Sequence, residues 1–206
     1  MAFKPPSLSN AAALKPHRLQ TPVASIAAAL QRAMPIRLAT LSDLPRLHPV
    51  IERAYRGDTA SESWAVQSAP PASPRTSLPA LADILADPAE RLLIASGPDG
   101  APAGCVQISD RGDGRAYLGL LCVDPALQSD GLGHRLITAA EQLAITDFGT
   151  RRMEMTVIST HHKLIQYYQR RGYEPTGEQR PYPVLLDPPQ QMIVLAKALA
   201  ARKQFG

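Results

Sequence analysis

Hydrophobic and polar positions fall into a regular order only beyond the first 34 residues of the chain. Alternating apolar positions predict strands, and apolar positions three or four residues apart predict amphipathic helices. This spacing predicts helices near residues 43–56, 78–86, 131–148 and 163–171, the first of them capped by Ser42. Strands are expected at residues 36–39, 91–96, 103–109, 116–123, 152–158 and 191–198. Residues 173–182 are expected to be extended but irregular.

Turn signals between these elements indicate how the strands are connected. The glycine-containing links 97–100 and 111–114 are too short for crossovers, so they favour antiparallel hairpins. The later strands alternate with helices, as they do in β-α-β units. The predicted fold is therefore a mixed α/β (α+β) domain, in which an antiparallel meander is followed by β-α-β-α-β. Residues 58–77, rich in Pro, Ser and Ala, are expected to be a functional or a disordered loop.

Charge is distributed unevenly along the chain. The formal net charge is +4, and residues 1–34 hold Lys4, Lys15, Arg18 and Arg32 without any acidic residue. The remainder therefore sums to zero, +4 minus +4. A neutral remainder has no electrostatic footprint for nucleic acid. No apolar run approaches the roughly 18 residues of a membrane-spanning helix. We expect neither nucleic acid nor a membrane as a partner.

Composition divides the chain into an N-terminal extension (1–34), one domain (35–200) and a short C-terminal tail (201–206). The extension is basic and rich in Ala, Ser and Pro, which is typical of an organelle transit peptide. Two alternatives remain open, a disordered tail and an upstream start with Met34 as the true initiator. The expected location is cytoplasmic, or mitochondrial if the extension is a transit peptide.

Neither the cysteines nor the histidines indicate covalent or metal chemistry. Cys105 and Cys122 lie in apolar, strand-like runs, so we interpret them as buried free thiols in a reducing compartment. A cysteine in a buried strand is usually inert packing and not a nucleophile. His161 and His162 are adjacent, their side chains diverge, and no third ligand is evident. No metal is expected.

A glycine-containing loop joins the strand 116–123 to the helix that follows it. Pro125 blocks continuation of the strand, and Gly131 and Gly133 flank the start of the helix. Glycines let backbone N–H groups approach a ligand closely, and a helix N-terminus carries partial positive charge. The loop therefore predicts an anion cradle suited to a pyrophosphate. It lacks the Gly-Lys-Ser/Thr of a triphosphate-binding loop and the spacing of a dinucleotide fingerprint.

Further motifs place this loop in a wider pattern. They are Val123-Asp124-Pro125 with Gln128-x-x-Gly131-x-Gly133, the run Leu164-Ile165-Gln166-Tyr167-Tyr168-Gln169-Arg170-Arg171-Gly172-Tyr173, and the opening Ile36-Arg37-x-Ala39-Thr40. In this order, from Met34 to Ala198, they resemble the Gcn5-related N-acetyltransferase (GNAT) superfamily. The resemblance implies the acyl-CoA N-acyltransferase fold. In that fold a mostly antiparallel sheet, flanked by helices, is splayed between two parallel strands, here 116–123 and 152–158.

The resemblance also implies a co-substrate and a set of site residues. Acetyl-CoA would lie between the two parallel strands, with the backbone of Leu121 facing its thioester carbonyl and Tyr168 protonating the departing thiolate. Val123 would pair with the pantetheine amides, and the loop would hold the pyrophosphate. The implied coenzyme-binding residues are Leu121, Cys122, Val123, Gln128, Ser129, Asp130, Gly131, Leu132, Gly133 and His134.

The sequence departs from the family pattern at three places. Asp130 lies among the groups that would bind phosphates, where a negative charge should weaken affinity. The strand 116–123 has no carboxylate, although many relatives place a catalytic base there. His161 stands where relatives often have Asn or Arg. The general base is thus unassigned, and a water chain or an amine of low pKa would remove the need for one.

Four side chains are expected to line the acceptor site: Tyr55, Trp64, Arg75 and His161. Arg75 could clamp a carboxylate, which would indicate an acidic or amino-acid-like acceptor. The predicted function is transfer of an acetyl group from acetyl-CoA to a primary amine of a small molecule or a protein, by direct attack. The alternative is a non-catalytic module that binds or senses acyl-CoA. Relatives commonly pair, so a homodimer is compatible with the resemblance.

Overall fold

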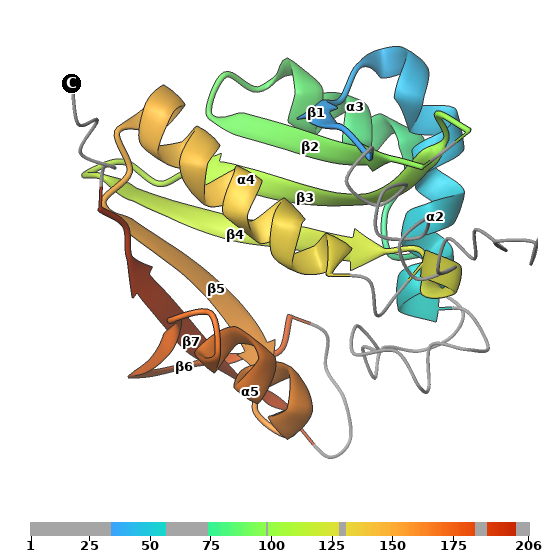
Figure 1. The fold of residues 1–206 in the computed structure, drawn as a ribbon. Coiled ribbons are helices and arrows are strands. Elements are labelled where there is room, and N and C mark those ends of the chain that lie inside the picture. The colour runs from blue at the N-terminus through green and yellow to red at the C-terminus, as the bar shows by residue number, and fades with distance from the viewer. Residues whose placement is uncertain (1–33, 57–73, 98, 128–130, 184–188, 201–206) are drawn as a thin grey trace, which may run out of the picture.

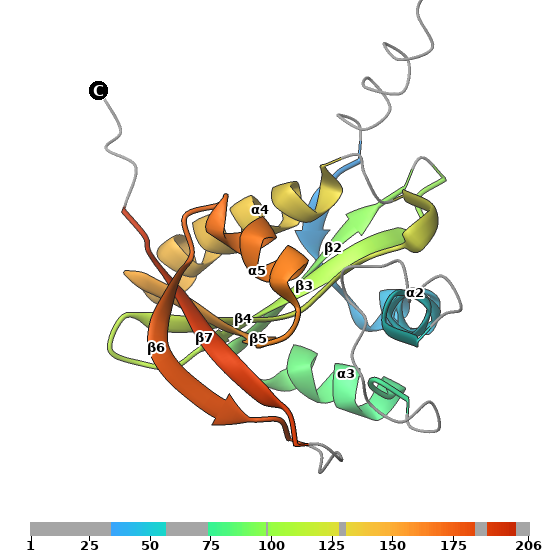
Figure 2. The same ribbon diagram turned by 90° about the horizontal axis from the view of Figure 1, so that it is seen from below.

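The computed structural model describes residues 34–56, 74–97, 99–127, 131–183 and 189–200. Figures 1 and 2 show a single sheet with helices on both of its faces. The strands are β1 (Ile36–Leu38), β2 (Glu90–Ser96), β3 (Pro102–Asp110), β4 (Arg115–Val123), β5 (Arg152–Ile158), β6 (Glu174–Pro181) and β7 (Gln191–Ala198). The helices are η1 (Leu41–Asp43), α2 (Leu44–Arg56), α3 (Leu78–Ala86), η3 (Pro125–Leu127), α4 (Leu132–Phe148) and α5 (His162–Gln169).

The sheet has the strand order β1-β2-β3-β4-β5-β7-β6. Its one parallel pair among the described strands is β4 with β5, and every other neighbouring pair is antiparallel. The parallel register covers only Arg115–Tyr117 against residues 152–154, and beyond it the two strands diverge (Figure 1). The predicted mixed sheet, splayed between two parallel strands, is therefore confirmed.

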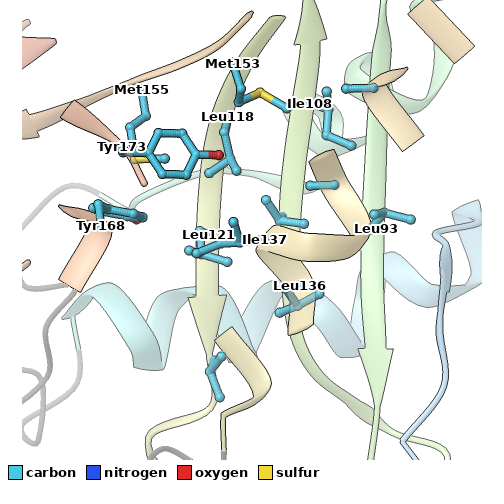
Figure 3. Packing of buried hydrophobic residues seen from close by; sticks show 14 of the residues in the cluster. Leu93, Ile108, Leu118, Leu121, Leu136, Ile137, Met153, Met155, Tyr168 and Tyr173 are labelled. Carbon is cyan, nitrogen blue, oxygen red and sulfur yellow. The ribbon is translucent and has the colours of Figure 1, made fainter. Parts of the chain in front are cut away.

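Side chains on opposite faces of the sheet belong to two separate cores. The larger core lies under α4 and α5 and includes Leu118, Leu121 and Met153 (Figure 3). The smaller core lies under α2 and α3 and includes Leu120 and Cys122. Because strand side chains alternate between faces, β4 contributes to both cores and fixes α2 relative to α4.

The structure corrects one detail of the sequence prediction and confirms another. Thr40, not Ser42, precedes the first helical turn, and both its N–H and its hydroxyl donate to Asp43 Oδ2, at 2.8 and 2.7 Å. Residues 174–181 form the strand β6, whose register with β7 shifts between Pro175 and Gln179, so the expected extended but irregular segment is confirmed. Nearly every β6 side chain is exposed, so this edge strand lacks the alternation of apolar and polar residues that would have predicted its pairing.

The sequence did not reveal an irregularity in β4. Cys105 pairs with Cys122 and Gln107 with Gly119, so one residue of β3 lies opposite both Leu120 and Leu121. This arrangement is a β-bulge, and its first residue, Leu120, has a φ of 46°, in the left-handed region. Because the bulge shifts the alternation of the strand, Leu120 faces the smaller core although Leu118, two residues earlier, faces the larger one.

The described part of the chain is already packed at its first residue. Met34 is buried, and its carbonyl accepts a 2.6 Å hydrogen bond from Arg135 Nη2 on α4. Residues 1–33 of the predicted extension and the predicted tail 201–206 lie outside the described residues. None of the described helices is long and apolar enough to cross a membrane.

Candidate functional site

The point at which β4 and β5 separate is marked by a side-chain contact. The Tyr117 hydroxyl and Thr156 Oγ1 lie 2.6 Å apart, just where the parallel register ends. Thr156 is paired on its other side with Val194 of β7, so β5 follows β7 away from β4. The separation is therefore built into the pairing of the strands and begins beside Tyr117.

The backbone of β4 turns polar groups toward this separation. Asp124 N donates to Ala103 O at 2.8 Å, so by the alternation of an antiparallel ladder Cys122 directs its N–H and C=O toward β3. The neighbouring Leu121 directs its own groups away from β3, toward the gap. Its carbonyl accepts a 3.0 Å hydrogen bond from the Tyr55 hydroxyl. In an extended residue the N–H lies on the same side as the C=O, so the Leu121 N–H also faces the gap.

Tyr55 reaches the gap from the last turn of α2. Its side chain is buried, and the Arg75 guanidinium carbon lies 4.9 Å from the centre of its ring. Burial raises the pKa of Tyr55, although the nearby guanidinium opposes this effect. The hydroxyl therefore keeps its proton at neutral pH and acts as the donor in its bond to Leu121.

Arg75 is held by its backbone, and its side chain lies over Tyr55. The Glu52 carboxylate accepts hydrogen bonds from Arg75 N at 3.0 Å and from Thr76 N at 3.1 Å. Arg75 Nε, in contrast, is buried and has no hydrogen-bond partner among the described residues. A buried donor without a partner is costly, so this guanidinium is available to an anionic group.

Tyr168 lies in α5 and is 5% exposed. Its ring meets those of Tyr167 and Tyr173 edge to face, with centroid distances of 5.3 and 6.0 Å, and Figure 3 shows Tyr168 beside Tyr173. Within the described part of the chain its hydroxyl makes no hydrogen bond. Burial raises the pKa of Tyr168 well above its usual range, and the hydroxyls of Tyr55, Tyr167 and Tyr117 raise it further. Tyr168 is thus a protonated phenol in the same electrostatic environment as Tyr55 and Tyr117.

The start of α4 lies just beyond the end of β4 (Figure 1). Asp124 fixes this corner, because its carboxylate accepts from Ala126 N at 3.1 Å and forms a salt bridge with Arg53 of α2. Gly131 then precedes the helix with a φ of 76°, a conformation that only glycine adopts readily. The first turn contains the predicted ligands Leu132, Gly133 and His134, whereas Gln128, Ser129 and Asp130 lie outside the described residues.

Three further predicted site residues are His161, Cys122 and Trp64. His161 caps the start of α5 at the end of β5, and burial lowers its pKa, so its imidazole is neutral at pH 7. Cys122 points into the smaller core, where its sulfur lies 3.5 Å from that of Cys105. Both are buried free thiols, as predicted. Trp64 lies outside the described residues, and those that are described contain no cluster of ligands that could hold a metal.

Sequence reasoning missed Tyr117, Thr156 and the bulge at Leu120. The alternation of residues 116–119 places Tyr117 on the face opposite α4, but its contact with Thr156 depends on a parallel register. That register is not readable from sequence, because a crossover through a helix leaves it free. The bulge was equally hidden, since a leucine with positive φ has no sequence signature.

Comparison with known proteins gives a consistent result. Residues 59–173 match the model of the acetyltransferase (GNAT) family. No curated protein sequence matches the chain significantly. Among solved structures, the ribosomal-protein-S18-alanine N-acetyltransferase from Escherichia coli is 19% identical, with a TM-score of 0.63, over 84% of this chain and 97% of that one.

Two other structures show the same likeness of fold. A GNAT-family acetyltransferase from Streptococcus pneumoniae is 18% identical, with a TM-score of 0.63, over 81% of this chain and 99% of that one. A mutant form of the spermidine/spermine N-acetyltransferase SpeG from Vibrio cholerae is 16% identical, with a TM-score of 0.61, over 81% and 94%.

Proposed function

The chain belongs to the GNAT acetyltransferase family, and we propose that it transfers the acetyl group of acetyl-CoA directly to a primary amine. The observation that carries this proposal is the end of the β4–β5 register at Tyr117. Beyond it, the Leu121 backbone and the Tyr168 side chain belong to the two sides of the gap. One side supplies an N–H donor and the other a phenol, which are the two groups that acyl transfer from a thioester requires.

The Leu121 N–H is proposed to bind the thioester carbonyl oxygen. When the amine attacks, negative charge develops on this oxygen, and a fixed donor stabilises that charge most in a water-poor site. The pyrophosphate would lie at the start of α4, where Leu132, Gly133 and His134 present the free N–H groups of the first helical turn. Carbonyl and pyrophosphate sites then lie at the same end of β4.

Tyr168 is proposed to assist departure of the coenzyme thiolate. The N–C bond forms, the C–S bond breaks, and the sulfur takes the phenolic proton. The amine loses a proton to solvent, and the Tyr168 phenolate regains one from solvent. A thiol titrates near about 8.5 and phenol near about 10 in water. Burial raises the pKa of Tyr168, so it is a weak acid that remains a hydrogen-bond donor at every working pH. Burial also raises the pKa of a thiolate in the same gap, which helps the transfer.

The acceptor is proposed to carry a carboxylate. Arg75 has its Nε buried without a partner among the described residues, and its guanidinium lies over Tyr55, which reaches the reacting end of the gap. A guanidinium binds a carboxylate through paired hydrogen bonds, so a bound carboxylate would satisfy the buried donor. Tyr55, Trp64 and His161 are proposed as further walls of the acceptor site.

The test measures thiol release from acetyl-CoA with matched pairs of amines, such as an amino acid and the amine that lacks its carboxylate. Products are identified by mass spectrometry. We expect faster release with the carboxylate-bearing member, and a loss of that preference in Arg75→Gln. The exposed Arg46 of α2 provides a matched control, Arg46→Gln, which should keep the preference. Tight binding of acetyl-CoA without thiol release for any amine would favour the alternative, a module that only binds acyl-CoA.

A further inference from the structure

The bulge in β4 lies at the reacting end of the gap and has little support from neighbouring strands. Leu120 and Leu121 have no register partner in β3, and the register with β5 has already ended at Tyr117. Leu120 is held at a φ of 46°, which a leucine adopts only when its surroundings enforce it. The peptide groups of these residues therefore lie outside the regular one-to-one ladder on both sides.

Two side chains supply the orientation that the ladder does not. The Tyr55 hydroxyl donates to the Leu121 carbonyl at 3.0 Å, and Cys105 Sγ donates to the Leu120 carbonyl at 3.4 Å. The sulfur is the weaker donor of the two. The stronger of these two bonds therefore holds the Leu121 carbonyl, and its donor, the Tyr55 phenol on α2, lies 66 residues away along the chain.

We propose that Tyr55 is a positioning residue, which holds the bulge so that the Leu121 N–H points at the thioester carbonyl. This inference rests on the proposed function, because it assigns the Leu121 N–H to that carbonyl. The Leu121 N–H and C=O belong to two neighbouring peptide planes that meet at the Leu121 Cα, so fixing the carbonyl restricts rotation at this residue and thereby limits the direction of the N–H. Tyr55 need not contact the coenzyme to have this effect.

The surroundings of Tyr55 suit this role. Its helix packs into the smaller core through Leu47 and Ile51, both fully buried, and its ring is covered by Arg75. Few rotamers are then open to the phenol, so its hydroxyl stays in place. Removal of the hydroxyl alone leaves this packing intact and frees only the Leu121 carbonyl.

The test is Tyr55→Phe, studied with isotope-edited infrared spectra of acetyl-CoA labelled with ¹³C at the carbonyl. A hydrogen bond lowers the stretching frequency of the bound carbonyl, so the variant should show a smaller shift from the free frequency than the wild type. Calorimetry should show acetyl-CoA affinity falling about three- to tenfold, the range of one hydrogen bond, with CoA affinity unchanged. CoA has no thioester carbonyl and serves as the internal reference.

Tyr173→Phe is the matched control, because it also deletes one buried hydroxyl and one hydrogen bond, to Glu141 Oε1 at 2.9 Å. It should preserve both the carbonyl frequency and the affinity ratio. If Tyr55→Phe keeps the wild-type frequency and ratio, the inference fails while the proposed function stands. If the wild type binds neither acetyl-CoA nor CoA, the proposed function fails, and the role of Tyr55 fails with it.

Discussion

The β4–β5 pair has a closed end, Arg115–Tyr117 with residues 152–154, and an open end formed by the rest of both strands. Near the closed end, three polar side chains form one hydrogen-bonded cluster. Lys197, paired with Met153, donates to both carboxylate oxygens of Glu141, at 2.8 and 2.7 Å. The Tyr173 hydroxyl donates to the same carboxylate at 2.9 Å. A helix, a strand and the turn after α5 are thereby joined at one point.

At the open end some of the corresponding groups lack partners within the described residues. Tyr168 is 5% exposed and its ring centroid lies 6.0 Å from that of Tyr173, yet its hydroxyl makes no hydrogen bond there. Arg75 Nε is buried and likewise without a partner among them. Folded proteins pair nearly all buried polar groups, so we take Arg75 Nε as a point where a ligand would complete the structure. We propose that the closed end maintains the fold and that the open end binds the reactants.

The largest effect is expected from Tyr168→Phe at the open end. Turnover should fall about 100-fold, because general acid catalysis contributes at least that much in many enzymes. The dissociation constant for acetyl-CoA should barely change, since the phenyl ring retains the packing. Turnover with the best acceptor and coenzyme affinity by calorimetry measure the two quantities separately. Wild-type turnover in the variant would show that Tyr168 is a core tyrosine with no part in the reaction.

A smaller effect, on stability, is expected from Lys197→Met at the closed end. The change leaves Glu141, 13% exposed, with only the Tyr173 hydroxyl beside it. We expect the free energy of unfolding to fall by about 1–3 kcal/mol, because the carboxylate is left partly buried and unpaired. Urea denaturation measures this loss.

The exposed ion pair of Arg180 with Glu178 serves as the control for that experiment. Arg180→Met should cost about 0.5 kcal/mol or less, as surface pairs contribute little. Coenzyme affinity should survive Lys197→Met. A large loss of affinity would show that the closed end also shapes the coenzyme site. The proposed separation of function between the two ends would then be wrong.

The smallest effect concerns His161 at the margin of the open end. Because burial lowers its pKa, the folded chain binds a proton here less readily than the unfolded chain does. The neutral His161 ring therefore contributes fully to the stability of the folded state above the unfolded pKa of about 6.5. This contribution is lost as the pH falls below that value.

His161→Asn removes this pH dependence. The difference in stability between wild type and variant should therefore shrink by about 0.5 kcal/mol or less from pH 7.5 to pH 5.0, since the half-exposed ring is screened by solvent. Urea midpoints at both pH values measure it. An unchanged difference would mean that His161 titrates alike in the folded and unfolded chain.

Local patterns in the sequence predicted most of the fold. The bounds of α3 and of β5 agree with the expected ones, because clear caps and turns delimit both elements. Gly149 ends α4 in the left-handed conformation, as its position after an apolar stripe indicated. The edge strand β6 was predicted only as an irregular extended segment, because its pattern depends on pairing with β7 and not on burial.

The site was predictable only where a motif marks it. Tyr168 and Gly131 are part of such motifs. Tyr168 is buried in α5 and Gly131 precedes α4, and their roles in the reaction stay predictions. The hydrogen bond from Tyr55 to Leu121 joins residues 66 positions apart, and no pattern in the sequence connects them. Contacts of this kind arise from tertiary packing, which the single sequence does not encode in any short pattern.

The short β4–β5 register also affects how the sheet opens by local unfolding. Three pairs of residues join the backbone of β1–β4 to that of β5–β7, so amide hydrogens in the two halves should exchange with solvent through separate openings. A coenzyme with amides along its length, bound in the gap, would act as a substitute strand between the halves. Saturating ligand, at about 100 times its dissociation constant, adds about 2.7 kcal/mol to the folded state. Exchange in both halves would then slow together, because each half would open only after the coenzyme leaves.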